Sequence, residues 1–183
     1  MIRPRYIGQV RVDVTTRDGV VVPVPRVGLA RAVAAAAQAA GAPLPVSVGV
    51  ILSDDAELAT LNAAHMGKSG PTDVLSFPLF PPEAFPEHEG GPRSRGAAQG
   101  SVDSFVLPPG RRPHLGDIVV SVERAVAQAR NGRGGQTGDV RWSPADELRL
   151  LVTHGTLHLC GWDHADPVEG AAMRALERRL LGS

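Results

Sequence analysis

The stretch HGTLHLCGWDH, residues 154–164, gathers three of the six histidines of the chain into eleven residues. The three are His154, His158 and His164, spaced by four and then by six positions. A single histidine is usually an isolated polar residue with its own hydrogen-bond partner, and three unrelated histidines remain the alternative here. The regular spacing instead favours a shared metal ion, if the local backbone brings the rings together.

Strong helix signals precede this stretch. Ser143 is a favourable N-cap, Pro144 suits the first helical position, and two acids follow where the helix dipole favours negative charge. Gly161 is typical of the residue that ends a helix. We therefore expect a helix over residues 143–160 and a turn after it.

On such a helix His154 and His158 project from the same face, one turn apart. Gly161 lets the chain reverse, so that His164 can return toward the other two. Three neutral imidazoles predict one tetrahedral Zn²⁺ ion with its fourth position open to water, which is the arrangement of catalytic zinc sites. Cys160 should point elsewhere, as a small core residue.

The spacing also fits the zinc peptidase frame H-E-x-x-H-x-x-G-x-x-H, with one difference. Gly155 stands where the peptidases carry the glutamate that serves as general base. Glycine cannot take a proton, which disfavours peptide hydrolysis. It does permit close approach of another backbone or of a bulky substrate, and a phosphodiester is a candidate because a metal can polarise it and activate water.

Strand-like and helix-like segments alternate along the rest of the chain. Strands are expected at residues 10–16, 46–52, 73–79 and 115–121. Helices are expected at residues 25–40, 56–65, 122–130, 143–160 and 167–181. The strands are too few and too unevenly spaced for a doubly wound sheet. The expected fold class is α+β, a small mixed sheet with helices packed on it and the metal site on a helix plus the following turn.

Two details refine this scheme. Pro78 lies in the third expected strand and indicates an edge or an end, because proline cannot donate a sheet hydrogen bond. In the last helix, apolar residues recur every four positions and mark its expected buried face. They are Val168, Ala172, Leu176 and Leu180.

One domain, residues 1–183, is expected, with the character of a metallohydrolase. Residues 81–113 are rich in proline and glycine and poor in large apolar side chains. They predict a flexible surface insertion, with a partner-docking loop as the alternative. Residues 131–139 predict a glycine-rich loop.

The bulk composition excludes several classes of protein. Nineteen basic and nineteen acidic residues balance, so bulk charge does not indicate a strongly basic nucleic-acid binder. A single cysteine rules out an internal disulfide. The N-terminus lacks the apolar core of a signal peptide, and no apolar run approaches the ~20 residues that span a bilayer. We expect a cytoplasmic protein that is not associated with membranes.

Three motifs resemble the YbeY family of bacterial rRNA maturation factors. HGTLHLCGWDH is similar to the family signature H-G-x-L-H-L-x-G-[YW]-D-H. The pair at residues 61–62 and the run PTDVLSFP at residues 71–78 resemble a second block, and LGDI at residues 115–118 resembles a third. The motifs occur in family order and cover roughly residues 46–181, apart from the insertion.

The resemblance implies a zinc ion on His154, His158 and His164 and cleavage of single-stranded RNA. It also implies processing of ribosomal RNA, with the small ribosomal subunit as partner. Two features depart from the family pattern. Met66 stands where an arginine suited to a phosphate contact is expected, and the insertion before Leu115 is longer than usual.

Six polar residues outside the histidine cluster are candidates for further roles. Asp73 and Asp117 are the candidate catalytic carboxylates, with loop capping as the alternative for each. Candidates for substrate binding are Lys68, Thr72, Ser76 and Arg124. The alternatives are turn chemistry for Thr72, filling of a small space for Ser76 and a solvated basic face for Arg124.

Three functions are consistent with these residues. The first is a zinc-dependent single-strand endoribonuclease whose metal-bound water attacks the phosphodiester. The second is a non-catalytic ribosome-associated factor with a structural metal, an interpretation that Met66 supports. The third is a zinc peptidase, which Gly155 disfavours.

Overall fold

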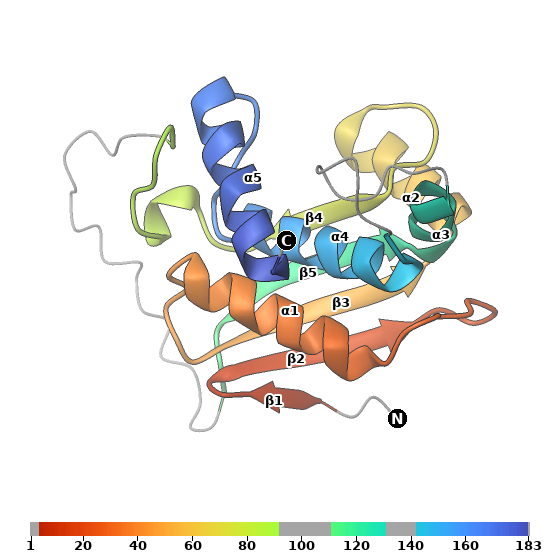
Figure 1. Ribbon diagram of the computed structural model, residues 1–183, viewed down its shortest axis with the longest axis horizontal. Helices are drawn as coiled ribbons and strands as arrows, with labels where there is room; N and C mark the ends of the chain where they lie inside the picture. The colour runs from red at the N-terminus through yellow and green to blue at the C-terminus, as the bar shows by residue number, and fades with distance from the viewer. Residues whose placement is uncertain (1–3, 92–110, 131–141, 183) are drawn as a thin grey trace.

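A five-stranded mixed sheet forms the centre of the protein in a computed structural model that describes residues 4–91, 111–130 and 142–182 (Figure 1). The strands lie in the order β1-β2-β3-β5-β4. Their bounds are β1 Arg5–Ile7, β2 Val10–Thr16, β3 Val46–Ser53, β4 Val74–Pro78 and β5 His114–Ser121. The expected α+β class is confirmed, and four of the five strands coincide with the predicted ones to within a residue or two.

The three central strands run parallel, and the two edge strands run antiparallel to their neighbours. β3 is buried almost throughout, as expected of a central strand covered on both faces. β4 is an edge strand, which confirms the inference from Pro78. β1 was not predicted, because a three-residue strand offers no periodicity to detect.

Helices cover the two faces of the sheet unequally. Their bounds are α1 Arg26–Ala39, α2 Asp55–Leu61, α3 Val122–Arg130, α4 Pro144–Leu159 and α5 Pro167–Leu181. α1, α4 and α5 enclose the main core with the sheet, and α3 lies beside α4 (Figure 1). A smaller cluster of Leu58, Leu75 and Val119 places α2 against the opposite face. None of the described helices combines the length and the apolar character needed to cross a bilayer.

The helix predicted over residues 56–65 is shorter than expected. α2 ends at Leu61, and a π-helical turn, Asn62–Met66, follows it. Gly67 closes this turn with a φ of 63°, and the Asn62 side-chain amide donates to the carbonyl of Gly70 at 2.8 Å. The wider turn directs residues 62–68 toward the histidine cluster, and π-turns are frequent at functional sites.

The first part of the predicted insertion is packed against the protein. A 3₁₀ turn, Pro82–Ala84, is followed by Phe85, which is buried in the main core. Residues 82–91 lie on the surface, as predicted, and Phe85 attaches them to the core. Residues 92–110 and the predicted glycine-rich loop at 131–139 lie outside the described residues, and flexibility of the segment as a whole remains a prediction.

The buried face of α5 differs from the predicted apolar stripe. Val168 is 53% exposed, whereas Met173 is buried. Two acids, Glu169 and Glu177, are also buried on this face. A search for apolar periodicity does not detect them. Glu177 contacts His154, and Glu169 contacts the backbone of Asp163 beside His164.

Candidate metal centre

α4 is fixed at both ends, and this determines where its histidines lie. At its start the Ser143 hydroxyl accepts from the backbone N–H of Asp146, whose carboxylate accepts from the backbone N–H of Ser143. At its end Gly161, at φ 82°, donates to the carbonyl of His158, and Trp162 donates to that of Leu157. This pair of bonds is a Schellman motif, which sets the direction of the chain toward His164.

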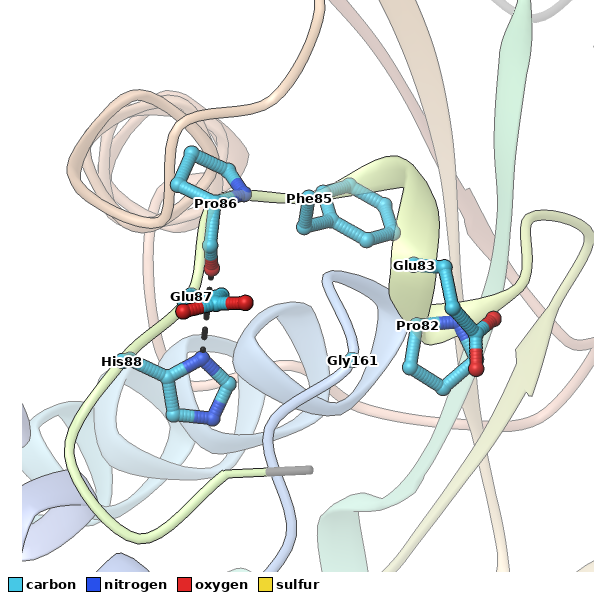
Figure 2. A pocket seen from close by; sticks show the side chains of 7 residues that line it. All are labelled: Pro82, Glu83, Phe85, Pro86, Glu87, His88 and Gly161. Atoms are coloured by element: carbon cyan, nitrogen blue, oxygen red, sulfur yellow. Dashed lines mark hydrogen bonds between the residues drawn. The ribbon is translucent and has the colours of Figure 1, made fainter. Parts of the chain in front are cut away.

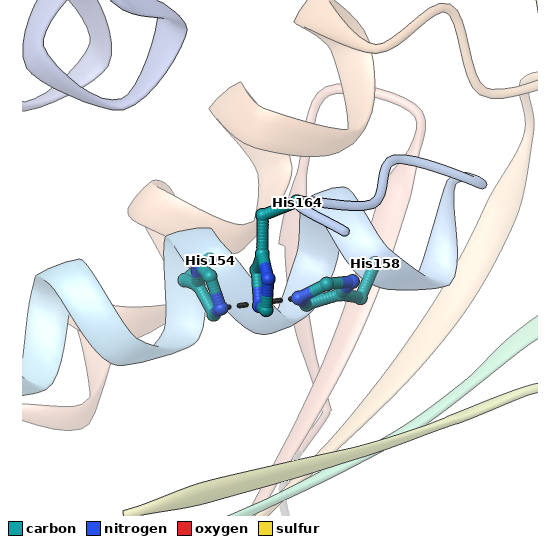
Figure 3. Close-up of side chains that lie close together, drawn as sticks. All are labelled: His154, His158 and His164. Atoms are coloured by element: carbon teal, nitrogen blue, oxygen red, sulfur yellow. Dashed lines mark hydrogen bonds between the residues drawn. The ribbon is translucent and has the colours of Figure 1, made fainter. Parts of the chain in front are cut away.

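The three histidines converge as predicted. The Nε2 atoms of His154 and His158 lie 3.1 Å apart. One potential ligand atom from each of these rings and from His164 falls within 4.8 Å of the others, so all three can contact one ion (Figure 3). In the described ranges, this metal-ligating group consists of the three histidines alone.

The outer nitrogen of each helical histidine has an acceptor. His154 Nδ1 lies 2.7 Å from Oε1 of Glu177, and His158 Nδ1 lies 2.8 Å from the carbonyl oxygen of Trp162. A carboxylate and a carbonyl have no proton to donate, so each Nδ1 carries the hydrogen. With both rings neutral, as metal binding requires, the two Nε2 lone pairs face one another at 3.1 Å.

Two facing lone pairs repel, and a cation between them removes the repulsion. Nitrogen ligands about 2.0–2.1 Å from a tetrahedral zinc lie roughly 3.3 Å from each other, close to the separation observed here. The donor set therefore fits a metal ion, and the outer acceptors orient the rings as in other histidine metal sites.

The protonation state of His158 suits metal binding. Burial, assisted by the neighbouring His154 and His164, lowers its pKa to about 4. The ring is therefore neutral at pH 7 and offers a lone pair without first losing a proton.

Cys160 does not belong to the metal site. It is fully buried in the main core, and burial raises the pKa of its thiol to about 12. Since only a thiolate is a good ligand or nucleophile, the prediction of a small core residue is confirmed.

His164 depends on its turn rather than on a helix. The Asp163 carboxylate accepts from the backbone N–H groups of His164, at 2.7 Å, and Ala165, at 3.3 Å. These bonds lower the pKa of Asp163. The backbone N–H of Asp163 in turn donates to the buried carboxylate of Glu169 at 2.7 Å.

A cleft of about 830 Å³ opens beside the histidines. The π-turn, β4 and the end of α4 line it. Four of the predicted residues lie along it, namely Lys68, Thr72, Asp73 and Ser76. Met66 also lines it and is 47% exposed, so the position where an arginine was expected does face the cleft.

Asp73 is held in place by several donors. Its carboxylate accepts from the Thr72 hydroxyl at 3.2 Å, the Val74 backbone at 3.0 Å and the Gln128 amide at 3.1 Å. Thr72 thus takes part in turn chemistry while lining the cleft. Asp73 also borders a second hollow beside His154 and His164, and it is the candidate carboxylate that lies close to the histidines.

Gly155 serves the packing of α4 on the sheet. A Cβ at this position would lie 2.8 Å from Ile118 and 3.0 Å from Ser76. The Ser76 hydroxyl donates to the Gly155 carbonyl at 3.1 Å. The close approach expected at Gly155 is therefore to β4 and β5, and the position has no room for a peptidase glutamate.

Asp117 and Arg124 lie away from the cleft. Asp117 lies on the sheet face opposite α4, where it accepts from His114 at 3.2 Å beside Gly49. Arg124 forms a double hydrogen bond with Asp55, at 3.2 and 3.1 Å. Neither residue is among those that line the cleft, because strand alternation turns Asp117 to the other face and an ion pair holds Arg124 at Asp55.

Comparisons with known proteins agree with the motifs. The family model described as Endoribonuclease YbeY matches residues 26–183. A relative named Endoribonuclease YbeY from Roseiflexus castenholzii is 38% identical over 76% of this chain and 70% of its own. Another from Roseiflexus sp. (strain RS-1) is 41% identical over 75% of this chain and 69% of its own. The solution structure of TM1509 from Thermotoga maritima covers 93% of this chain and 89% of its own, at 20% identity and a TM-score of 0.49.

Proposed function

The chain belongs to the endoribonuclease YbeY family, and we propose from this that it cleaves single-stranded RNA with one Zn²⁺ ion held by His154, His158 and His164. The observation that carries the proposal is the pair of Nε2 lone pairs 3.1 Å apart, with a third imidazole beside them. A cation between the two neutral rings would remove the repulsion of their lone pairs.

Different residues have different proposed roles at this site. When bound to the three histidines, a zinc ion would polarise a phosphoryl oxygen and lower the pKa of its water toward ~7. Glu177 and the Trp162 carbonyl orient two of the rings. Asp73, fixed by its donors beside His154, is the proposed acceptor for a proton released in the cleft.

We propose that the cleft takes an extended single strand. It runs along the edge strand β4, and Lys68 lines it with a cation for a phosphate. Few aromatic side chains are available for base stacking, since the whole chain has only seven phenylalanine, tryptophan and tyrosine residues (4 Phe, 2 Trp, 1 Tyr). Binding should therefore depend on the backbone of the RNA and be sensitive to salt.

Ribosomal RNA in the small ribosomal subunit is the proposed substrate, and the cytoplasm the proposed location. The similarity of three motifs to a family of rRNA maturation factors supports both. A non-catalytic ribosome-associated factor is the second candidate, because Met66 removes a phosphate contact from the cleft. A peptidase is not supported, since position 155 cannot hold the required glutamate.

A cleavage assay tests the proposal. Single-stranded and duplex RNA of the same sequence are incubated with the protein, with and without a chelator. Cleavage of the single strand that is lost with the chelator and restored by Zn²⁺ is expected. His158→Ala should abolish it, whereas His114→Ala, on the opposite face of the sheet, should not. Metal-independent cleavage, or none with a fully loaded protein, would contradict the proposal.

A further inference from the structure

We infer that His88 is a positioning residue for the metal centre, although it lies in the segment that the sequence predicted as a loose insertion. It acts through residues 82–91, which we call the strap. This inference rests on the proposed metal at the three histidines. It concerns how the turn between His158 and His164 is held, and not the ligands themselves.

Glycines allow the strap to contact the neighbouring segments closely. A Cβ on Gly41 would lie 2.5 Å from the ring of Pro86, and a Cβ on Gly161 would lie 2.9 Å from Cα of Pro82. A Cβ on Gly90, at φ 78°, would lie 2.2 Å from the backbone nitrogen of Glu169. The strap therefore contacts the ends of α1 and α4 and the first turn of α5, and Phe85 anchors it in the core.

The His88 ring contacts two residues at once. It stacks on Trp162 with ring centroids 3.9 Å apart and planes at 13°. Its Nε2 lies 2.7 Å from Oε1 of Glu169, and the ring must be the donor because a carboxylate has no proton to give. Nδ1 is 3.5 Å from the Pro86 carbonyl, at the limit of a hydrogen bond (Figure 2).

Each of these two contacts holds a residue that in turn positions one of the proposed metal ligands. The carbonyl of Trp162 accepts from His158 Nδ1 and so fixes the orientation of that ring. Oε1 of Glu169 accepts both from His88 and from the backbone N–H of Asp163, each at 2.7 Å. Asp163 directly precedes His164 and caps its backbone N–H.

Loss of His88 should therefore loosen two ligand supports together. The Glu169 side chain is only 5% exposed, and a buried carboxylate that loses a donor becomes unfavourable where it stands. Displacement of Glu169 releases the Asp163 backbone, and loss of the stacked ring frees Trp162. Removal of a group bonded directly to a ligand typically weakens metal binding 10–100-fold, and loss of His88, one contact further out, should cost less.

Cobalt(II) titration of the full-length protein tests this role, because its visible spectrum reports ligand geometry independently of catalysis. His88→Ala should raise the Kd for Co²⁺ by a factor of about 3–10 and alter the spectrum of the bound ion. His88→Gln keeps a donor, and His88→Phe keeps a stacked ring. Each should restore part of the affinity.

Glu89→Gln is the matched control, as an exposed residue of the same strap, and should bind Co²⁺ like the wild type. Thermal unfolding of the metal-free proteins is measured in parallel. If His88→Ala fails to fold, the Gln and Phe variants carry the test.

The possible outcomes are distinct. If the wild type binds one Co²⁺ and all three His88 variants bind it as tightly with the same spectrum, His88 has no positioning role, even if the variants melt earlier. The proposed function would survive that result. If the wild type binds no Co²⁺ at the three histidines, the proposed function and this inference both fail.

Discussion

The metal centre has two arms that are held in different ways. His154 and His158 stand on α4, are half-buried, and are fixed by a capped helix. His164 is exposed and follows a turn whose backbone depends on Asp163 and Glu169. The backbone of the helical arm is set by local sequence, although Glu177 orients the His154 ring. The backbone of the turn arm depends on the Glu169 carboxylate and, through it, on His88 of the strap.

This difference indicates where the site can be weakened without unfolding the protein. Damage to the helical arm removes ligands or disturbs the core. Damage to the turn arm should loosen one ligand and leave the fold intact. Substitutions in the two arms can therefore be ordered by their expected effect on metal affinity.

The largest effect is expected from His158→Ala. His158 supplies one of the two Nε2 atoms that already face each other. Loss of its ring should lower Zn²⁺ affinity by more than the 10–100-fold that is typical when a group bonded to a ligand is removed. His164→Ala should cost less, because the helical pair survives. Competition with a chromophoric chelator measures both. Equal losses in the two variants would refute the two-arm description.

Glu177→Gln should have the next largest effect on Zn²⁺ affinity. The amide can still accept from His154 Nδ1, but the negative charge that strengthens the ring as a ligand is lost. We expect roughly tenfold weaker Zn²⁺ binding by the same competition assay. Glu83→Gln, an exposed acid outside the site, is the control. Wild-type affinity in Glu177→Gln would mean that this carboxylate does not support the metal.

The metal-free protein should lose stability as the pH falls from about 6.5 to about 4. The pKa of His158 is about 4 when folded and 6.5 as its ordinary value. Between these values the unfolded chain binds the extra proton, so the free energy of unfolding declines by about 3 kcal/mol as the solution is acidified. Urea unfolding with a chelator present measures this. In His158→Gln the free energy of unfolding should decline less over the same pH range, because the contribution of His158 is removed. An unchanged slope would exclude burial of a neutral His158.

Met66→Arg should leave both arms unchanged and alter only the cleft. Zn²⁺ affinity and melting temperature should stay at wild-type values, since Met66 is exposed. An arginine there can bind a phosphate, so the KM for single-stranded RNA should fall about tenfold. Steady-state cleavage kinetics measure this. A fall in Zn²⁺ affinity would show that position 66 is coupled to the metal centre.

The sequence was most informative where the structure is local. The Ser143 cap, the Gly161 stop and the i, i+4 spacing predicted α4 and the convergence of its histidines. The edge position of β4 followed from Pro78. Each of these features depends on residues within a few positions of one another.

Long-range contacts were not predictable in the same way. Glu169 and Glu177 are buried acids on α5, and an apolar pattern hides them because charged residues are read as exposed. One signal was available: Glu169 and Glu177 are eight positions apart and share a helix face with Met173 and Leu176. The sheet face on which Asp117 lies was not predictable, because it depends on strand register, which single residues do not show.

The strap was missed for a related reason. Its composition is typical of a loop, yet Phe85 and His88 pack against residues far along the chain. Such packing depends on glycines at the ends of α1 and α4, whose importance appears only once the segments are adjacent.

X-ray absorption at the zinc edge of the purified protein tests the metal centre most directly. Three imidazole nitrogens and one solvent oxygen, all at about 2.0–2.1 Å, are expected, with one ion per chain. A sulfur ligand at about 2.3 Å, which only Cys160 or a methionine could supply within the chain, would contradict the three-histidine site. A protein that holds no stoichiometric metal would contradict it equally.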